Sequence, residues 1–431
     1  MSKAINGSSN KTKTTFLFGA GAAIPFNGPT THDLTQIALK IGPNIRDEEK
    51  TITQYIFDKL LDAGFSEDEV NFETLIAVLE ELYIFYANTH NNISSFYSVF
   101  LNGDKFKHKV VNPNHLEGTV RMLESGATTE NEIQEIIKEL VGKIIIEINA
   151  EIHQYAYHTK SSKLKLLSTN EEDKKGLIEN FQKWIQSIKS ESSIRIYTLN
   201  YDSIFKAIMQ EVGINLFDGF NETDNLNKRG PDLYKIISDS EEDIHYNLHG
   251  SIYWRFTDID DWEHEDNIPF IVKGYGPSLP EMRVFKGVEK GKPLLLSSII
   301  SGYQKVQRIS IPPLREMHNA FEKDCMESNK LIIVGYSLGD DHINRIIQTA
   351  FFYNENLKIE IVDPSDLTNS TKSMDYKILR EFDRFSNPSL PKNTDDDKVK
   401  LLCDDRIILH NKYLEDYLSC EIKMSVLSVK P

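Results

Sequence analysis

The chain has 431 residues, of which 40% are hydrophobic and 26% charged, as is typical of a folded globular protein. Its 65 acidic residues outnumber its 49 basic ones, which gives a formal net charge of −16 and, without a dense basic run, disfavours direct nucleic-acid binding. No apolar run approaches the roughly 18 residues of a membrane span, and the polar start does not resemble a signal peptide. We therefore expect a cytoplasmic protein that is not bound to membranes.

The first predicted strand covers residues 14–18 (TTFLF), after a polar leader at 1–13, and runs into the sequence GAGAA at 19–23. An apolar run that stops at glycines indicates a buried strand followed by a tight turn. Glycine lets the backbone approach a pyrophosphate, and the next helix offers N–H groups to it. A turn without a ligand is the alternative. The third glycine of a dinucleotide fingerprint is replaced by Ile24, which disfavours an ordinary dehydrogenase.

Residues 41–189 are predicted to form a second, mostly helical domain inserted into the first. Apolar residues recur at steps of three and four along 72–83 and 133–152, as one face of a helix requires. These faces offer more apolar surface than one sheet edge would cover. The surplus either packs against another subunit, which would make the protein a homo-oligomer, or forms a self-contained helical core.

Strands and helices alternate again after residue 190. The pattern predicts helices at 202–212 and 340–353 and apolar strands at 194–199, 244–248, 331–334 and 358–362. This alternation predicts an α/β fold, with a Rossmann-like parallel sheet covered by helices and built from 14–40 and 190–365. Residues 366–431 would be a C-terminal extension packed on this domain, with a solvated loop at 386–400, a strand near 406–409 and a terminal helix.

Polar residues follow two of the predicted strands, where ligands of parallel sheets bind. Asn200 and Asp202 lie two residues apart after one strand, and His249 follows another and precedes a glycine. An amide can bind a ribose hydroxyl, a carboxylate can orient a polar group or cap a helix, and an imidazole can accept a proton near neutral pH. A capping aspartate and a structural histidine are the simpler alternatives.

Taken together and in this order, the motifs resemble the sirtuin family: Gly-Ala-Gly at 19–21, Thr-x-Asn-x-Asp at 198–202 and His-Gly at 249–250. The resemblance extends to Gly335-x-Ser337 and to Asp363, each at the end of a later predicted strand. It consists of short motifs scattered over 14–35 and 190–365. It implies a fold that binds NAD between a Rossmann-like sheet and a smaller domain.

The chain also departs from the deacetylating sirtuins, which carry a four-cysteine zinc ribbon after the histidine motif. Its three cysteines, Cys325, Cys403 and Cys420, lie far apart, so we expect no zinc and disfavour lysine deacylation. The runs AIPFNGPTTHDL at 23–34 and GYSLGDDH at 335–342 are similar instead to bacterial sirtuin-like effectors that hydrolyse NAD in antiphage defence. This resemblance implies abortive infection through NAD depletion, with a homo-oligomer or a HerA-type ATPase as partner.

The resemblance also implies roles for the candidate residues, with NAD as the substrate and nicotinamide and ADP-ribose as the products. Asn200 would hold the ribose hydroxyls and a water, His249 would act as the base, and Asp202 would orient the nicotinamide. Eight further residues would contact the phosphates or the adenosine side of NAD: Gly19, Ala20, Gly21, Ala22, Thr198, Gly335, Ser337 and Asp363.

Two other functions are compatible with the sequence. The run GYSLG at 335–339 has the form of the nucleophile elbow of α/β-hydrolases, with Ser337 followed by Asp363 and His410 in that fold's triad order. This alternative leaves the motifs around Asn200 and His249 unexplained. The second alternative is a non-catalytic subunit that binds NAD or ADP-ribose and scaffolds a partner ATPase, because a fold does not determine a function.

Overall fold

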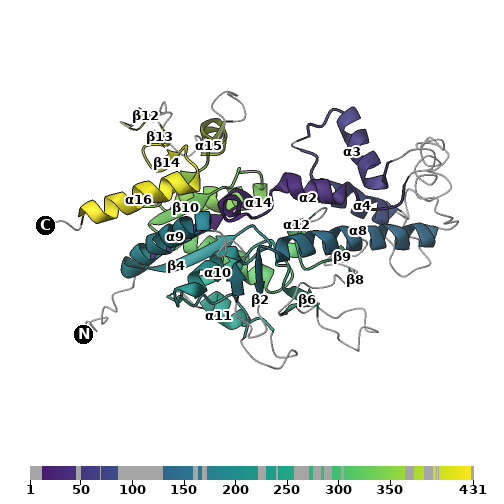
Figure 1. The fold of residues 1–431 in the computed structure, drawn as a ribbon, viewed down its shortest axis with the longest axis horizontal. Helices are drawn as coiled ribbons and strands as arrows, with labels where there is room; N and C mark the ends of the chain where they lie inside the picture. Colours follow the sequence, from purple (N-terminus) through teal and green to yellow (C-terminus); the bar gives the residue numbers. More distant parts are fainter. Residues whose placement is uncertain are drawn as a thin grey trace, which may run out of the picture.

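The structure is a computed structural model (Figure 1). It describes residues 12–44, 50–67, 69–85, 130–158, 164–166, 172–221, 230–238, 241–256, 271–274, 283–285, 294–301, 305–364, 373–382, 392–394, 396 and 398–428. Most of the expected leader at 1–13 and residues 386–391 of the expected loop therefore lie outside the described residues.

One sheet of eight strands forms the centre of the molecule. Its strands are β1 (Thr12–Phe18), β4 (Ser192–Thr198), β5 (Ile244–Asn247), β10 (Lys330–Val334), β11 (Lys358–Val362), β12 (Lys392–Asn393), β13 (Val399–Leu402) and β14 (Ile407–His410). They lie in the order β12-β13-β14-β11-β10-β1-β4-β5, and the six from β14 to β5 are parallel. Numbered along the chain, these six run 6-5-4-1-2-3, the strand order of a doubly wound Rossmann fold. The predicted fold class is confirmed.

The strand order reverses between β1 and β10, and this point is where doubly wound sheets bind their ligands. The two strands pair in parallel register, with Phe18 opposite Val334 at their carboxyl ends. The loops that begin at Gly19 and Gly335 therefore emerge side by side.

Helices cover both faces of the sheet, as predicted. Side chains of β1 alternate between two apolar clusters, with Phe16 and Phe18 in one and Leu17 in the other. The first cluster includes α9 (Glu172–Glu191), α10 (Ile204–Glu211) and α16 (Leu414–Ser428). The second includes α11 (Leu233–Ser238), α13 (Leu314–Glu327), α14 (Asp341–Tyr353) and α15 (Met374–Phe382).

A block of four helices lies beyond one end of the sheet (Figure 1). Its members are α2 (Thr31–Ala38), α3 (Ile52–Asp62), α4 (Phe72–Phe85) and α8 (Glu130–His153). The two predicted helical faces are confirmed in α4 and α8, although the side chain of Ile133 lies outside the described residues. Their apolar residues are buried within this chain, which favours the self-contained core; the homo-oligomer stays a prediction.

The expected domain boundaries also stay a prediction. The contacts show which other elements the helices in and next to the expected 41–189 segment pack against. α9, which lies within that segment, packs against β4 and α16 on the sheet. α2, which precedes the segment, packs against α4 and α8 in the block. The apolar cluster on this face of the sheet also includes Leu75 of α4 and Ile144 of α8, so sheet and block share one core.

The expected loop at 386–400 is wrong at residues 392–393 and 399–400, which lie in strands. Residues 392–393 form β12, and β13 pairs antiparallel with β14, so the sheet ends in a mixed edge. The turn between β13 and β14 contains three consecutive left-handed residues, Cys403, Asp404 and Asp405, with φ of 51°, 57° and 64°. Left-handed backbone at three residues other than glycine gives little signal in a sequence, since such residues rarely adopt it.

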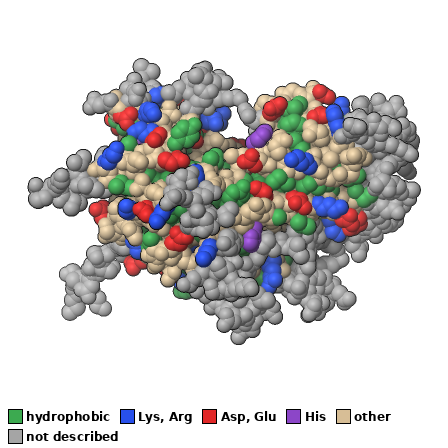
Figure 2. Space-filling view, viewed as in Figure 1, with side chains coloured by type: hydrophobic (Ala, Val, Ile, Leu, Met, Phe, Trp, Pro, Cys, Tyr) green, Lys and Arg blue, Asp and Glu red, His purple; other side chains and the backbone are tan. Residues whose placement is uncertain are grey.

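Shorter elements connect these layers. They are α1 (Ala20–Ala23), the 3₁₀ helix η1 (Ile24–Phe26), α12 (Lys305–Ile309) and three antiparallel pairs: β2 (Ala156–His158) with β3 (Leu164–Leu166), β6 (Trp254–Phe256) with β7 (Ile271–Lys273), and β8 (Arg283–Phe285) with β9 (Leu294–Leu296). None of the helices in the described ranges has the length and apolarity needed to cross a bilayer. On the face drawn in Figure 2, acidic and basic side chains of the described residues are interspersed.

Candidate active site

A cavity of about 550 Å³ opens at the carboxyl ends of the parallel strands. The loops after β1, β4, β5, β10 and β11 all contribute to its lining, and α2, α4 and α12 contribute from the other side. The volume lies within the roughly 300–1,000 Å³ of small-molecule sites. Most of the predicted site residues line this cavity: Gly19, Ala20, Gly21, Asn200, Asp202, His249, Gly335, Ser337 and Asp363.

The loops after β1 and β10 touch through the backbone of Gly19, Gly21 and Gly335. The Gly21 N–H donates a hydrogen bond of 3.0 Å to the Gly335 carbonyl. A Cβ on Gly335 would lie 2.2 Å from the Ala22 nitrogen, and one on Gly21 would lie 2.9 Å from the Gly335 Cα. Side chains at these glycines are therefore excluded by the neighbouring loop, and the N–H of Gly21 is already used. The expected approach of a pyrophosphate to these glycines stays a prediction.

Ala22 and Thr198 do not line the cavity, so any part they take in NAD binding would be indirect. Ala22 is fully buried, and its N–H donates to the Gly19 carbonyl at 3.0 Å. Thr198 is buried at the end of β4, where its Oγ1 accepts a hydrogen bond of 3.0 Å from the Asn200 N–H. Both residues shape the loops that line the site.

Asn200 connects the loop after β4 to the glycine loop. Its Nδ2 donates to the Gly19 carbonyl at 3.1 Å. Asn247, at the end of β5, donates from its own Nδ2 to the carbonyls of Asn200 and Asp202, at 2.9 Å each. The turn that carries the predicted Asn and Asp is therefore held by its neighbours on both sides.

Asp202 has two roles that the sequence analysis kept as alternatives. Its Oδ1 accepts a hydrogen bond of 2.8 Å from the N–H of Ile204, the first residue of α10, although the N-cap residue of that helix is Ser203. It also lines the cavity. Burial raises the pKa of its carboxyl to about 6, because the charged form loses its hydration.

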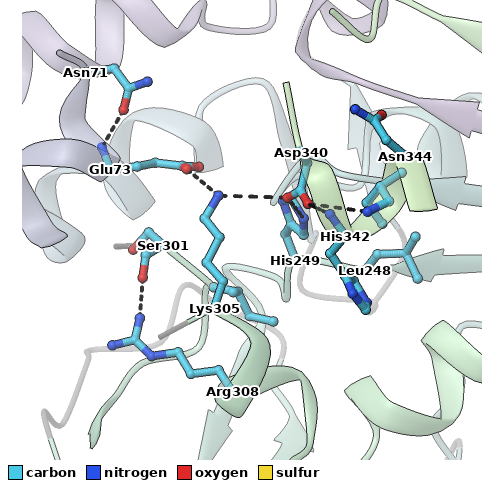
Figure 3. Close-up of polar contacts among 12 residues, drawn as sticks. Asn71, Glu73, Leu248, His249, Ser301, Lys305, Arg308, Asp340, His342 and Asn344 are labelled. Atoms are coloured by element: carbon cyan, nitrogen blue, oxygen red, sulfur yellow. Dashed lines mark hydrogen bonds and ion pairs between the residues drawn. The ribbon is translucent and has the colours of Figure 1, made fainter. Parts of the chain in front are cut away.

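His249 is fixed by an acidic partner that the sequence analysis did not assign. Its Nε2 lies 3.2 Å from Oδ2 of Asp340, the residue that caps α14 (Figure 3). Burial alone would raise the pKa of the Asp340 carboxyl, but the hydrogen bond from His249 and the positive charge of Lys305 lower it far below its usual range. The backbone just before His249 is held by His318, whose Nε2 lies 2.9 Å from the Leu248 carbonyl.

An ion-pair chain continues from Asp340 to the helical block (Figure 3). Lys305 Nζ lies 4.0 Å from Asp340 Oδ2 and 2.6 Å from Oε2 of Glu73, which is in the first turn of α4. Tyr201, between the predicted Asn200 and Asp202, donates its hydroxyl to Glu73 Oε1 at 2.7 Å. Burial raises and Lys305 lowers the pKa of Glu73, and the net effect is a lowered pKa.

These additional residues differ in how visible they are in the sequence. Asp340 is the first residue of the helix predicted at 340–353, and an aspartate at the start of a helix is a usual signal for an N-cap. Glu73 and Lys305 lie on helices without a recognisable motif, and they meet only through the fold. Tyr201 lies between Asn200 and Asp202, and only these two neighbours carry the amide and the carboxylate that the motif predicts as site residues.

Ser337 and Asp363 follow β10 and β11, on the other side of the switch point from Asn200 and His249, which follow β4 and β5. Ser337 is exposed, and its carbonyl accepts a hydrogen bond of 3.2 Å from Lys377. Burial raises the pKa of Asp363 to about 6, opposed by the charge of Lys377. The His410 ring packs instead against Tyr417, at 4.9 Å between centroids, and within the described part of the chain no histidine bonds the Ser337 hydroxyl. This geometry disfavours the hydrolase alternative.

A metal site is not formed by the residues that the structure describes, because no three His, Cys, Asp or Glu side chains among them are arranged to hold an ion. The absence of zinc stays a prediction.

Comparison with known proteins gives one informative match. Residues 194–359 match the model of the SIR2-like domain, which confirms the resemblance to sirtuins for this region. The region contains Asn200, Asp202, His249 and Asp340, whereas Gly19, Gly21 and Asp363 lie outside it. No curated protein matches the chain significantly.

Two solved structures of Sir2 homologues are similar to the chain at low level. A mutant in complex with ADP-ribose is 11% identical, with a TM-score of 0.36, over 97% of this chain and 95% of that one. A mutant in complex with 2′-O-acetyl ADP-ribose is 10% identical, with a TM-score of 0.38, over 98% and 94%. TM-scores this low do not establish a shared fold. The Rossmann-like fold of this chain is established by its own strand order.

Proposed function

We propose that the protein is an NAD glycohydrolase that cleaves NAD to nicotinamide and ADP-ribose. The observation that carries this proposal is that Asn200, Asp202 and His249 line one cavity with the glycine loop at the switch point of a Rossmann-like sheet. The match of residues 194–359 to the SIR2-like domain supports NAD as the ligand.

Cleavage of the nicotinamide–ribose bond passes through an oxocarbenium-like state with a neutral leaving group. The protein must therefore position the ribose, stabilise developing charge and direct a water molecule. Asn200, whose Nδ2 is held by the Gly19 carbonyl, would use its Oδ1 to accept a hydrogen bond from a ribose hydroxyl or from that water.

His249 would act as the general base. The Asp340 carboxylate only accepts hydrogen bonds, so the proton of the neutral imidazole lies on Nε2 and Nδ1 carries the lone pair. Nδ1 can then take a proton from the water or from a ribose hydroxyl. The negative charge of Asp340 would stabilise the imidazolium that results.

The remaining lining residues would bind the rest of NAD. Asp202 would accept a hydrogen bond from the nicotinamide carboxamide, while Gly19, Ala20 and Ser337 would lie along the phosphates. Asp363, at the end of β11, would bind the adenosine ribose.

We further propose that the enzyme depletes NAD in the cytoplasm as an antiphage effector, as a homo-oligomer or with a HerA-type ATPase. The support is the similarity of the runs at 23–34 and 335–342 to such effectors, since Thr30, His32 and Ser337 from these runs line the cavity. Cellular NAD should fall after phage infection in cells with the wild-type gene and stay level in cells with Asn200→Ala.

The decisive experiment follows nicotinamide release from NAD by the purified protein, with and without the product of its neighbouring gene. We expect nicotinamide and ADP-ribose in equal amounts, no consumption of acetyl-lysine, and no release by Asn200→Ala. Binding of ADP-ribose without any cleavage, under all activating conditions, would favour the non-catalytic subunit instead.

A further inference from the structure

The two carboxylate oxygens of Asp340 have different partners. Oδ1 accepts hydrogen bonds from the backbone N–H groups of His342 and Ile343, at 3.0 and 3.4 Å, and so caps α14. Oδ2 faces His249 Nε2 at 3.2 Å and Lys305 Nζ at 4.0 Å (Figure 3). His249 and Lys305 therefore approach the same oxygen.

Glu73 decides where the ammonium group of Lys305 lies. Its Oε2 is 2.6 Å from Lys305 Nζ, so Glu73 holds the close contact with Lys305, and the ion pair between Lys305 and Asp340 is longer, at 4.0 Å. Glu73 itself is fixed at the start of α4, where its N–H donates to Asn71 Oδ1 at 2.9 Å. Its other oxygen accepts the Tyr201 hydroxyl at 2.7 Å.

We propose that Glu73 is a positioning residue for His249, because it holds Lys305 at 4.0 Å from Asp340 Oδ2 and leaves the closer contact with that oxygen, at 3.2 Å, to the imidazole. A lysine–carboxylate ion pair in a partly buried site is stronger than a hydrogen bond from a neutral imidazole. Without Glu73, Lys305 would need to move only about 1 Å to reach normal ion-pair distance. It would then displace His249.

This proposal rests on the proposed function, in which His249 is the base. It gives the helical block a part in catalysis, since Glu73 comes from α4 and the groups that it arranges come from the sheet domain. Among the described residues, Asp340, His318 and His342 also interact with His249, and Lys305 acts on it through Asp340.

The structure offers a matched control on the same two helices. Glu80 of α4 forms a buried ion pair with Arg308 of α12, and Arg308 also donates to the Ser301 carbonyl. Loss of this pair would weaken the contact between α4 and α12 without removing the partner of Lys305. Glu80→Gln therefore separates general loosening of the helices from competition at Asp340.

Five variants test the proposal through kcat and KM for NAD: Glu73→Gln, Glu73→Asp, Lys305→Met, the double variant of Glu73→Gln with Lys305→Met, and Glu80→Gln. We expect Glu73→Gln to lose roughly 10- to 100-fold in kcat, with a smaller change in KM, because the base is misplaced. Adding Lys305→Met removes the competitor, so the double variant should regain the kcat of Lys305→Met alone. Glu73→Asp, which keeps the charge, should retain more kcat than Glu73→Gln.

Nitrogen NMR of ¹⁵N-histidine-labelled protein gives a readout that does not depend on NAD cleavage. The Nε2 signal of His249, assigned with His249→Gln, should lose its hydrogen-bonded character in Glu73→Gln and keep it in the double variant and in Glu80→Gln. If these signals change as expected but the wild type cleaves no NAD, the positioning role stands and the proposed function fails.

Three results would overturn the positioning role. One is an unchanged His249 signal in Glu73→Gln, whatever the activity. Another is equal loss of kcat in Glu73→Gln and Glu80→Gln, which would mean that only the packing of the helices matters. The third is a double variant as slow as Glu73→Gln. If Glu73→Gln does not fold, Glu73→Asp against Glu80→Gln tests the same point.

Discussion

The cavity is lined in two different ways. At the switch point, Gly19, Gly21 and Gly335 bring two loops together through backbone alone, with no space for a Cβ. Facing them, four ionisable side chains from different elements form a chain of contacts through His249, Asp340, Lys305 and Glu73. The glycine contacts depend on shape, and the ionisable residues depend on charge. Substitutions should therefore fail in different ways: those at the glycines should lose stability, and those at His249 should lose activity with little loss of stability.

The largest effect should come from His249→Ala. Removal of a general base costs on the order of 10²–10⁴ in kcat, whereas binding of ADP-ribose should change little. Nicotinamide release and calorimetric titration of ADP-ribose measure the two quantities separately. Undiminished hydrolysis by this variant would show that His249 is not the base. The ionisable side of the cavity would then have no demonstrated role in activity.

Asp202→Asn should raise stability at neutral pH. Burial raises the folded-state pKa of Asp202 to about 6, above the unfolded value near 3.9, so its favourable contribution is present below about pH 4 and lost as the pH rises through 6. Asparagine does not ionise, and its Oδ1 can still accept the hydrogen bond from the Ile204 N–H. The variant should gain roughly 3 kcal/mol at pH 7.5 and little at pH 4, as measured by urea unfolding. A loss at pH 7.5 would contradict the raised pKa.

Gly335→Ala should have the smallest of these effects, a loss of about 2 kcal/mol in the free energy of unfolding. The new Cβ would overlap the Ala22 nitrogen, and the backbone at Gly335 is left-handed, with φ of 60°. Gly213 is a matched control, because its φ is 73° but nothing lies within 4 Å of an added Cβ. Thermal unfolding should show a smaller loss for Gly213→Ala. Equal losses would mean that backbone strain alone, and not the loop contact, makes glycine necessary.

The parts of this site that the sequence predicts are those next to apolar strands. Gly19, Asn200 and His249 each follow such a strand, and parallel strands bring their carboxyl ends to one edge. Glu73 and Lys305 could not be predicted in this way. The sequence alone does not tell whether a charged residue on an amphipathic helix lies in a site or faces solvent. The sequence predicts a turn at Gly21, but only the packing of the two loops shows which atoms exclude a side chain there.

The shared core limits how the cavity can admit a ligand. Phe16 of β1, Leu79 of α4 and Ile144 of α8 belong to one apolar cluster, and all three are fully buried. A rigid swing of the helical block away from the sheet would expose this cluster to water, at about 25 cal/mol for each Å² uncovered. We therefore expect the block to form a fixed wall of the cavity rather than a hinged lid.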